Sequence, residues 1–254
     1  MKFSIVTVCR NSAATLCEAM SSLSEQTLRD YEWVLVDGGS HDDTLEIAER
    51  FTGPRGAWSS EPDNGIYDAM NKGVRRAHGE YLYFLNSDDR LHDSRVLADV
   101  DNFIADANFP DLVYGNVVYQ RPNGSTLRTW RHIHRGTLPF EDLCHQAVFA
   151  RRDLFDRIGL FNTRFVINAD YDWIIRVFRS GVATRWFERR VAVFRTGGMH
   201  MRDVVKAQAE RREVRLQYMS EMQLFAGDLW RRARHRWHRH LGPHRLGQIP
   251  LEES

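Results

Sequence analysis

The sequence predicts an α/β fold with a mostly parallel central sheet that is flanked by helices. Short apolar runs alternate with helical patterns through residue 89, and this order of elements builds parallel sheets. No internal repeat or low-complexity segment interrupts the alternation. We predict strands at residues 3–8, 32–36, 58–60 and 81–85.

Apolar residues three or four positions apart predict a helix after each of the first three strands. Asn11 and Ser12 are possible caps of the first helix, and Asp42 or Asp43 lies near the start of the second. The positions expected to face the core are Leu16, Met20 and Leu23 in the first helix, Leu45, Ala48 and Phe51 in the second, and Ile66, Met70, Val74 and Ala77 in the third.

The second half of the chain has a less regular pattern. Residues 112–120 read as a strand that pairs with residues 127–132 across a turn at 122–124, and residues 133–143 as a loop. The further elements we expect are a helix near 96–103, a strand running into a helix over 144–155, a helix over 169–181, a last strand at 191–194 and helices beyond it.

Composition indicates a soluble globular protein of 254 residues, with 43% hydrophobic and 27% charged residues. A net charge of +1 predicts no bulk attraction to nucleic acid. The three cysteines lack C-x-x-C spacing, which indicates neither a disulfide framework nor a zinc knuckle. The strand pattern begins by Phe3, and no apolar run approaches the ~20 residues of a spanning helix. We therefore expect a cytoplasmic location.

Two adjacent carboxylates, Asp88 and Asp89, follow the buried run at 81–85. Ligands of open α/β sheets bind beyond the carboxyl ends of strands, and hard divalent cations prefer oxygen ligands. The pair therefore predicts a metal site, although a solvated turn would suit the same residues. Asp37 ends another strand and could accept hydrogen bonds from a nucleobase or ribose, or could cap the helix that follows. Neither a P-loop nor a G-x-G-x-x-G motif is present.

Four blocks follow one another along the first part of the chain: SIVTVCRN, VLVDGGSHDDT, EPDNGIYDAMNKG and GEYLYFLNSDD. In their residues, order and spacing they resemble family 2 glycosyltransferases with the Rossmann-like GT-A fold. The resemblance covers residues 3–93 well, residues 143–200 less well, and nothing after about 205. It is closest to bacterial enzymes that decorate glycolipids or build extracellular polysaccharide. It implies a nucleotide-sugar donor, a diphosphate bound by Mn²⁺ or Mg²⁺, a saccharide or lipid-linked acceptor, and a base that activates the acceptor hydroxyl.

The resemblance also implies roles for single residues. Asn86 stands where many members have aspartate, and Met70 where many have arginine. The implied roles are nucleotide contacts for Thr7 and Asp37, donor contacts for Asn71 and Lys72, a metal ligand for Asp89, and a ribose contact or second metal ligand for Asp88.

The family's base belongs to an acidic pair that opens a late helix, and here Ala169-Asp170 stands in its place. Asp170 is therefore the candidate base, and direct attack opposite the leaving group would invert the anomeric carbon. The alternative is that Asp170 only caps the helix, and Asp172 is expected to be structural. His145 is a candidate contact of the donor sugar or diphosphate, with a hydrogen-bonded core histidine as the alternative. His200 is a candidate metal or diphosphate ligand.

We divide the chain into a domain over 1–225, with a nucleotide-binding half (1–93) and an acceptor-binding half (94–225), and a basic tail over 226–254. From Leu229 onward there are six arginines and two glutamates. Trp230, Ala233, Trp237 and Leu241 share one helical face, with arginines around the rest. This pattern predicts peripheral contact with the inner face of the cell membrane, with a solvated tail or a nucleic-acid patch as alternatives.

Two other functions fit part of the pattern. A nucleotidyltransferase would use similar nucleotide and metal chemistry, but TVCRNSAAT lacks the glycine- and arginine-rich phosphate loop expected after the first strand. A catalytically inactive sugar-nucleotide-binding scaffold is compatible with Asn86 and Ala169. The presence of all four aspartates (Asp37, Asp88, Asp89 and Asp170) favours an active metal-dependent, inverting glycosyltransferase.

Overall fold

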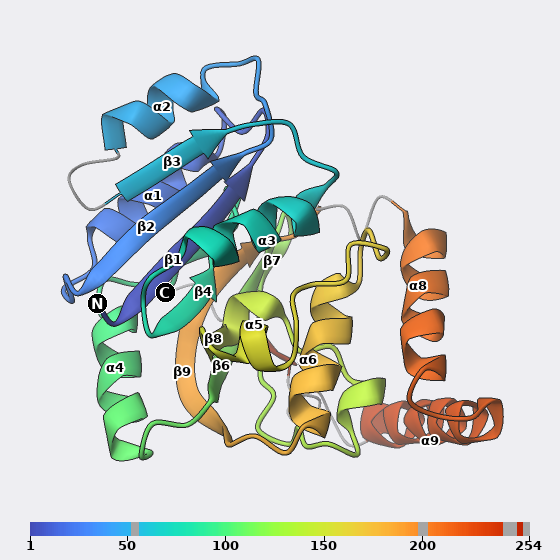
Figure 1. Ribbon diagram of the computed structural model, residues 1–254. Coiled ribbons are helices and arrows are strands. Elements are labelled where there is room, and N and C mark those ends of the chain that lie inside the picture. Colours follow the sequence, from blue (N-terminus) through green and yellow to red (C-terminus); the bar gives the residue numbers. More distant parts are fainter. Residues whose placement is uncertain (52–55, 198–202, 241–247, 251–254) are drawn as a thin grey trace.

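The computed structural model describes residues 1–51, 56–197, 203–240 and 248–250, with backbone only for 231–240 and 248–250. A central sheet carries helices on both faces, so the predicted α/β fold is confirmed (Figure 1). The main path of the sheet has the strand order β10-β7-β6-β8-β4-β1-β2-β3.

The first half is the parallel part of the sheet. Its strands are β1 (Phe3–Cys9), β2 (Tyr31–Asp37), β3 (Gly56–Ser60) and β4 (Tyr81–Phe84), and neighbours among them pair in parallel. The connecting helices are α1 (Leu16–Ser24), α2 (Thr44–Phe51) and α3 (Ile66–Arg76). In Figure 1, α3 lies in front of the parallel strands and α1 behind them. Gly73 lets α3 approach β1 closely, because a Cβ there would lie 2.4 Å from Val6 Cγ1.

Two details of the predicted helices are wrong. Asn11 and Ser12 do not cap α1, whose N-cap is Thr15. Their backbone amides instead donate to Ser40 Oγ and Thr44 Oγ1, which ties the β1–α1 loop to the β2–α2 loop. Phe51, which was expected to face the core, is the last residue of α2 and is exposed.

The second half adds mainly antiparallel pairs. After β5 (Arg90–Leu91) and α4 (Val96–Asp106), strand β6 (Leu112–Arg121) pairs antiparallel with β7 (Gly124–Arg128) and β8 (Val148–Arg151). The partner of β6 therefore starts directly at the turn, three residues before the predicted 127–132 segment. Strand β9 (Thr184–Arg195) also begins before the predicted residue 191 and runs parallel to β6.

The remaining elements are mostly helices of the second half of the chain. Short turns η1 (Leu138–Phe140) and η2 (His145–Ala147) precede β8, and α5 (Leu154–Arg157) follows it. Next come α6 (Ala169–Arg179), α8 (Val204–Leu216), α9 (Glu221–His240) and β10 (Gln248–Pro250), which pairs with β7. No helix in the described part of the chain is both long and apolar enough to cross a bilayer. The division into a domain over 1–225 and a tail stays a prediction.

Candidate active site

A cavity of about 780 Å³ opens where β1 and β4 end. Its walls combine both halves of the chain, as expected for a site at the carboxyl edge of a sheet. The lining comes from residues 8–15 at the end of β1 and after it, 63–69 before and within α3, 86–88 after β4, 142–146 around η2, 166–171 before and within α6, one face of α8, and single residues of β6 and β9.

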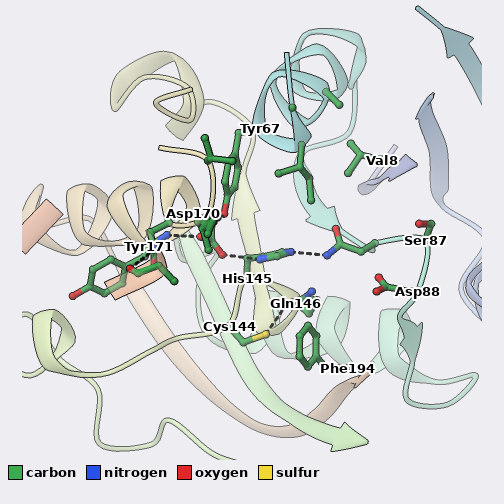
Figure 2. Close-up of a pocket in the computed structure, with 18 of the residues that line it drawn as sticks. Val8, Tyr67, Ser87, Asp88, Cys144, His145, Gln146, Asp170, Tyr171 and Phe194 are labelled. Atoms are coloured by element: carbon green, nitrogen blue, oxygen red, sulfur yellow. Dashed lines mark hydrogen bonds and ion pairs between the residues drawn. The ribbon is translucent and has the colours of Figure 1, made fainter. Parts of the chain in front are cut away.

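A chain of hydrogen-bonding side chains crosses this cavity (Figure 2). Asp170, the second residue of α6, has its Oδ2 2.8 Å from Nδ1 of His145. The Nε2 of the same imidazole lies 3.3 Å from Nδ2 of Asn86. The sequence-predicted residues His145 and Asp170 therefore lie together, although 25 residues separate them.

The Asp170 carboxylate also receives two donors on its other oxygen. Tyr171 N donates to Oδ1 over 2.8 Å, and the Tyr67 hydroxyl lies 2.8 Å from Oδ1 and 2.7 Å from the carbonyl of Ile167. Burial alone would raise the pKa of Asp170, but hydrogen bonds from His145 and Tyr67 and the backbone amide outweigh it and lower the pKa. The carboxylate is consequently ionised near neutral pH. The N-cap of α6 is Asn168, so Asp170 is free of the capping role considered above.

The segment that leads to Asp170 is anchored from α8. The buried carboxylate of Glu210 accepts the backbone amides of Val166 (2.9 Å), Ile167 (2.9 Å) and Asn168 (3.1 Å). Asn168 Nδ2 returns a bond of 2.9 Å to the carbonyl of Ala207. These bonds fix the backbone immediately before α6, and so fix the position of Asp170.

Replacing Glu210 with alanine should lower the free energy of unfolding by about 1–3 kcal/mol, because three amides lose their acceptor. Denaturant unfolding measures the loss. Glu213→Ala is the matched control, since Glu213 is an exposed residue of α8 that pairs with Arg164, and its removal should cost under about 1 kcal/mol. Equal losses in the two variants would show that Glu210 does not anchor the 166–168 segment.

The two aspartates after β4 have different environments. Asp88 is half-buried and lines the cavity. Asp89 is 2% exposed and faces the interior, where its oxygens accept from Gln146 Nε2 (2.7 Å) and Arg195 N (2.9 Å). Burial, and secondly the charge of Asp88, raises the pKa of Asp89 to about 7. This geometry runs against the expectation of Asp89 as the direct metal ligand and favours Asp88.

Hard oxygen donors line the cavity at this point. Among the described residues, no three histidine, cysteine, aspartate or glutamate side chains form a metal-binding cluster. A Mg²⁺-type ion can, however, be held by one carboxylate together with substrate phosphates. Asp88 supplies the carboxylate, and the nearby Asn86 Oδ1 is buried without a hydrogen-bond partner. The residues present therefore fit a divalent cation that a diphosphate helps to bind.

The predicted nucleotide contacts Thr7 and Asp37 are not in the cavity wall. The Thr7 hydroxyl is buried and accepts from Trp33 Nε1 over 3.0 Å. Asp37 turns back on its own loop, where it accepts from the amides of Gly39 and Ser40 and from both Ser40 Oγ and Ser60 Oγ. Burial would raise the pKa of Asp37, but Ser40 and the other donors lower it. Asp37 therefore shapes the loop.

The carboxylate that faces the cavity beside this loop belongs to Asp63. A Cβ on Gly38 would lie 2.2 Å from Asp63 Oδ2, so glycine at position 38 makes room for it. Arg10 also lines the cavity here. The D-N-G turn that contains Asp63 is visible in the sequence, but its approach to Gly38 depends on the fold.

Asn71 and Lys72, the predicted donor contacts, hold loops instead. Asn71 forms two hydrogen bonds with the backbone of Phe161: its Nδ2 donates to the carbonyl (2.9 Å) and its Oδ1 accepts from the amide (3.0 Å). Lys72 Nζ donates to the carbonyl of Pro62 (2.8 Å) and pairs with Asp68 (3.4 Å). Neither residue lines the cavity. Lys72 therefore holds the backbone next to Asp63 and does not itself face the cavity.

Two further predicted residues, His200 and Asp172, and two residues that were not predicted from the sequence complete the comparison. His200 lies outside the described residues. Asp172 is buried in α6 and accepts from Arg176 Nε and Tyr218 Oη, each over 3.0 Å, which fits the expected structural role. Tyr67 and Glu210 were missed, because their contacts with the 166–170 segment span long stretches of sequence.

Comparison with known proteins identifies the class of this fold and site. Residues 4–181 match the profile of glycosyl transferase family 2. A Mycobacterium bovis (strain BCG / Pasteur 1173P2) protein named PGL/p-HBAD biosynthesis glycosyltransferase is 41% identical over 201 residues, which cover 77% of each chain. The chain belongs to glycosyl transferase family 2, and it is a glycosyltransferase.

Solved structures support the fold. S. aureus TarS 1-349 in complex with UDP-GlcNAc has a TM-score of 0.68 at 20% identity, over 80% of this chain and 61% of the other. The mannosyltransferase PcManGT from Pyrobaculum calidifontis, in complex with GDP-Man and Mn²⁺, has a TM-score of 0.64 at 22% identity, over 82% of this chain and 61% of the other. This chain thus spans about three fifths of each of those structures.

Proposed function

We propose that this enzyme transfers a sugar from a nucleotide-sugar donor to a hydroxyl of a glycolipid, lipid-linked saccharide or polysaccharide precursor, with metal assistance and inversion. The observation that carries the proposal is that Asp170, whose hydrogen bonds lower its pKa, lines the same cavity as Asp88. One wall thus offers an oxygen ligand for a metal–diphosphate group, and another offers a base. The names of the relatives, which mention PGL biosynthesis, UDP-GlcNAc and GDP-Man with Mn²⁺, are consistent with it.

The reaction divides between two parts of the cavity. The acceptor oxygen attacks the anomeric carbon as the bond to the diphosphate oxygen breaks. Asp170 takes the proton of the attacking hydroxyl, and its bonds to His145, Tyr67 and Tyr171 N keep it oriented. Asp88 would hold a divalent cation, which when bound would stabilise the charge on the leaving diphosphate. One direct displacement inverts the anomeric carbon.

The test is a transfer assay in which the anomeric configuration of the product is determined by NMR. Inversion relative to the donor is expected, with transfer that depends on Mn²⁺ or Mg²⁺. Retention of configuration would contradict direct displacement with Asp170 as base. Transfer at full rate with the metal chelated would contradict the role given to Asp88.

We further propose that α9 attaches the enzyme peripherally to the cytoplasmic face of a membrane. One face of α9 contacts the body, since a Cβ on Gly227 would meet the ring of Phe140 at 2.0 Å. Met222, Phe225 and Leu229 lie on the opposite face by helical spacing and are 58–79% exposed. Further along α9 the sequence has five arginines between residues 231 and 239, and the structure does not describe their side chains. The part of the predicted apolar face at Trp237 and Leu241 is likewise outside the described side chains.

Changing Met222, Phe225 and Leu229 together to serine should lower binding to phosphatidylserine-containing vesicles at least about tenfold, because apolar area can no longer enter the interface. Vesicle sedimentation measures the loss. Val205→Ser is the control, since Val205 is an equally exposed apolar residue on α8. Unchanged binding by the triple variant would refute attachment through this face.

A further inference from the structure

Helix α8 turns one face to the cavity. Val204, Ala207, Gln208 and Arg211 all line it, and they stand at positions i, i+3, i+4 and i+7, the spacing of one helical face. The neighbouring Val205 is 81% exposed and is not part of the cavity wall. The contact between α8 and the cavity is therefore a property of this face alone.

The part of the cavity under α8 has apolar walls. Val204 of α8 and Val166 of the segment before α6 are both in the lining and are 51% and 40% exposed. Ala207 and Ile167 are in the lining as well, and the 166–168 segment is hydrogen-bonded to Glu210 and Ala207 of α8. Two exposed β-branched side chains at the rim of a cavity favour an apolar group as their occupant, since its binding would remove their surface from water.

Two polar residues of α8, Arg211 and Gln208, also line the cavity. Arg211 is held by the carbonyl of Glu141 (2.7 Å) and lies over the ring of Tyr171, 4.4 Å from its centroid. Gln208 lies between the valine and arginine positions on the helix and is exposed to the cavity. Its amide can exchange hydrogen bonds with a sugar hydroxyl.

The position of α8 in the chain gives a separate argument. The family profile matches residues 4–181, which include Asp88 and Asp170 but not α8. The wall formed by α8 is thus an addition to the shared part of the site. It lies on the Asp170 side of the cavity, where the proton of the acceptor must leave, whereas Asp88 and Asp63 lie after β4 and at the start of α3.

We propose that this face of α8, together with Val166, is the acceptor subsite, and that it takes a glycoside with an apolar aglycone. Val204 and Val166 contact the aglycone, and Gln208 bonds to a hydroxyl of the acceptor sugar next to Asp170. The inference rests on the proposed function and specifies the acceptor side of that site. It makes α8 the element that selects the acceptor.

The test compares hexyl β-D-glucopyranoside with methyl β-D-glucopyranoside, both titrated by NMR into the full chain below micelle-forming concentrations. The natural protein should bind the hexyl glycoside about tenfold more tightly, because only its chain buries apolar area. Val204→Asn should reduce this ratio at least about threefold, and Val205→Asn should leave it unchanged. A ratio near one in the natural protein, or equal losses in both variants, would overturn the proposal.

Gln208→Ala provides a second, independent variant. It should weaken both glycosides by the same factor and leave their ratio intact, since it removes a contact to the sugar. A changed ratio would overturn the assignment of Gln208. Titration of the same protein with nucleoside diphosphates distinguishes a failure of the acceptor subsite from a failure of the proposed function. If a nucleoside diphosphate binds but the hexyl glycoside is not preferred, only the acceptor subsite is wrong. If no nucleoside diphosphate binds, the proposed function is wrong.

Discussion

Asp170→Asn should lower kcat for sugar transfer by about 10²–10⁴-fold, the usual contribution of a positioned general base. The amide has nearly the same shape and can still accept from Tyr67 and Tyr171 N, but it cannot take a proton. Affinity for the nucleoside diphosphate should remain, because Asp88 lies elsewhere in the cavity. Steady-state kinetics and calorimetric titration measure the two quantities.

Asp172→Asn is the matched control in the same helix. Its carboxylate is buried with Arg176 and Tyr218, so the change should lower thermal stability while the folded fraction keeps its kcat. If Asp170→Asn transfers sugar at the natural rate, Asp170 is not the base. If both variants lose activity in proportion to lost stability, Asp170 is only structural.

The lowered pKa of Asp170 also sets the direction of the pH dependence. A carboxyl whose pKa is lower in the folded state contributes stability above its unfolded pKa and loses it as the pH falls through the folded pKa. The base is ionised over the same range. The contributions of Asp170 to kcat and to stability should therefore not change with pH near neutral pH, and both should be lost as the pH falls into the acid range.

Asp88→Asn should weaken Mn²⁺-dependent binding of the nucleoside diphosphate by at least about 10–100-fold, since even the outer partners of metal ligands contribute this much. The loss should appear only when metal is present, because the amide removes charge and not shape. Calorimetric titration with and without Mn²⁺ measures it.

Asp89→Asn separates the two assignments. Asp89 is enclosed by Gln146 and Arg195 N, so Asp89→Asn should alter stability. The factor by which Mn²⁺ raises the affinity for the nucleoside diphosphate should stay within about threefold of its value in the natural protein. Loss of the increment in Asp89→Asn, with Asp88→Asn unaffected, would restore Asp89 as the direct ligand.

The sequence was informative where structure depends on local pattern. The four parallel strands follow from short apolar runs, and the placement of Asp88 and Asp170 in one cavity follows from a strand end and a helix start that meet at the same edge of the sheet. Antiparallel partners were less predictable, because the start of β7 depends on the turn at Gly124 and the length of β9 on pairing with β6.

The direction of a side chain was the main property that the sequence could not predict. Thr7 and Asp37 lie at the right end of their strands, yet their polar atoms bind Trp33 and the Ser40 loop. The same limit applies to Tyr67 and Glu210. Their hydrogen bonds reach across 103 and 42–44 residues, respectively, and no local pattern encodes such contacts.

Calorimetric titration of the full chain with a panel of nucleoside diphosphates, in the presence and absence of Mn²⁺, tests the central claim most directly. We expect one nucleoside diphosphate to bind tightly and only with the metal, which would also identify the base of the donor. Failure of every nucleoside diphosphate to bind, with Mn²⁺ present and the protein folded, would contradict a metal-assisted nucleotide-sugar site at Asp88.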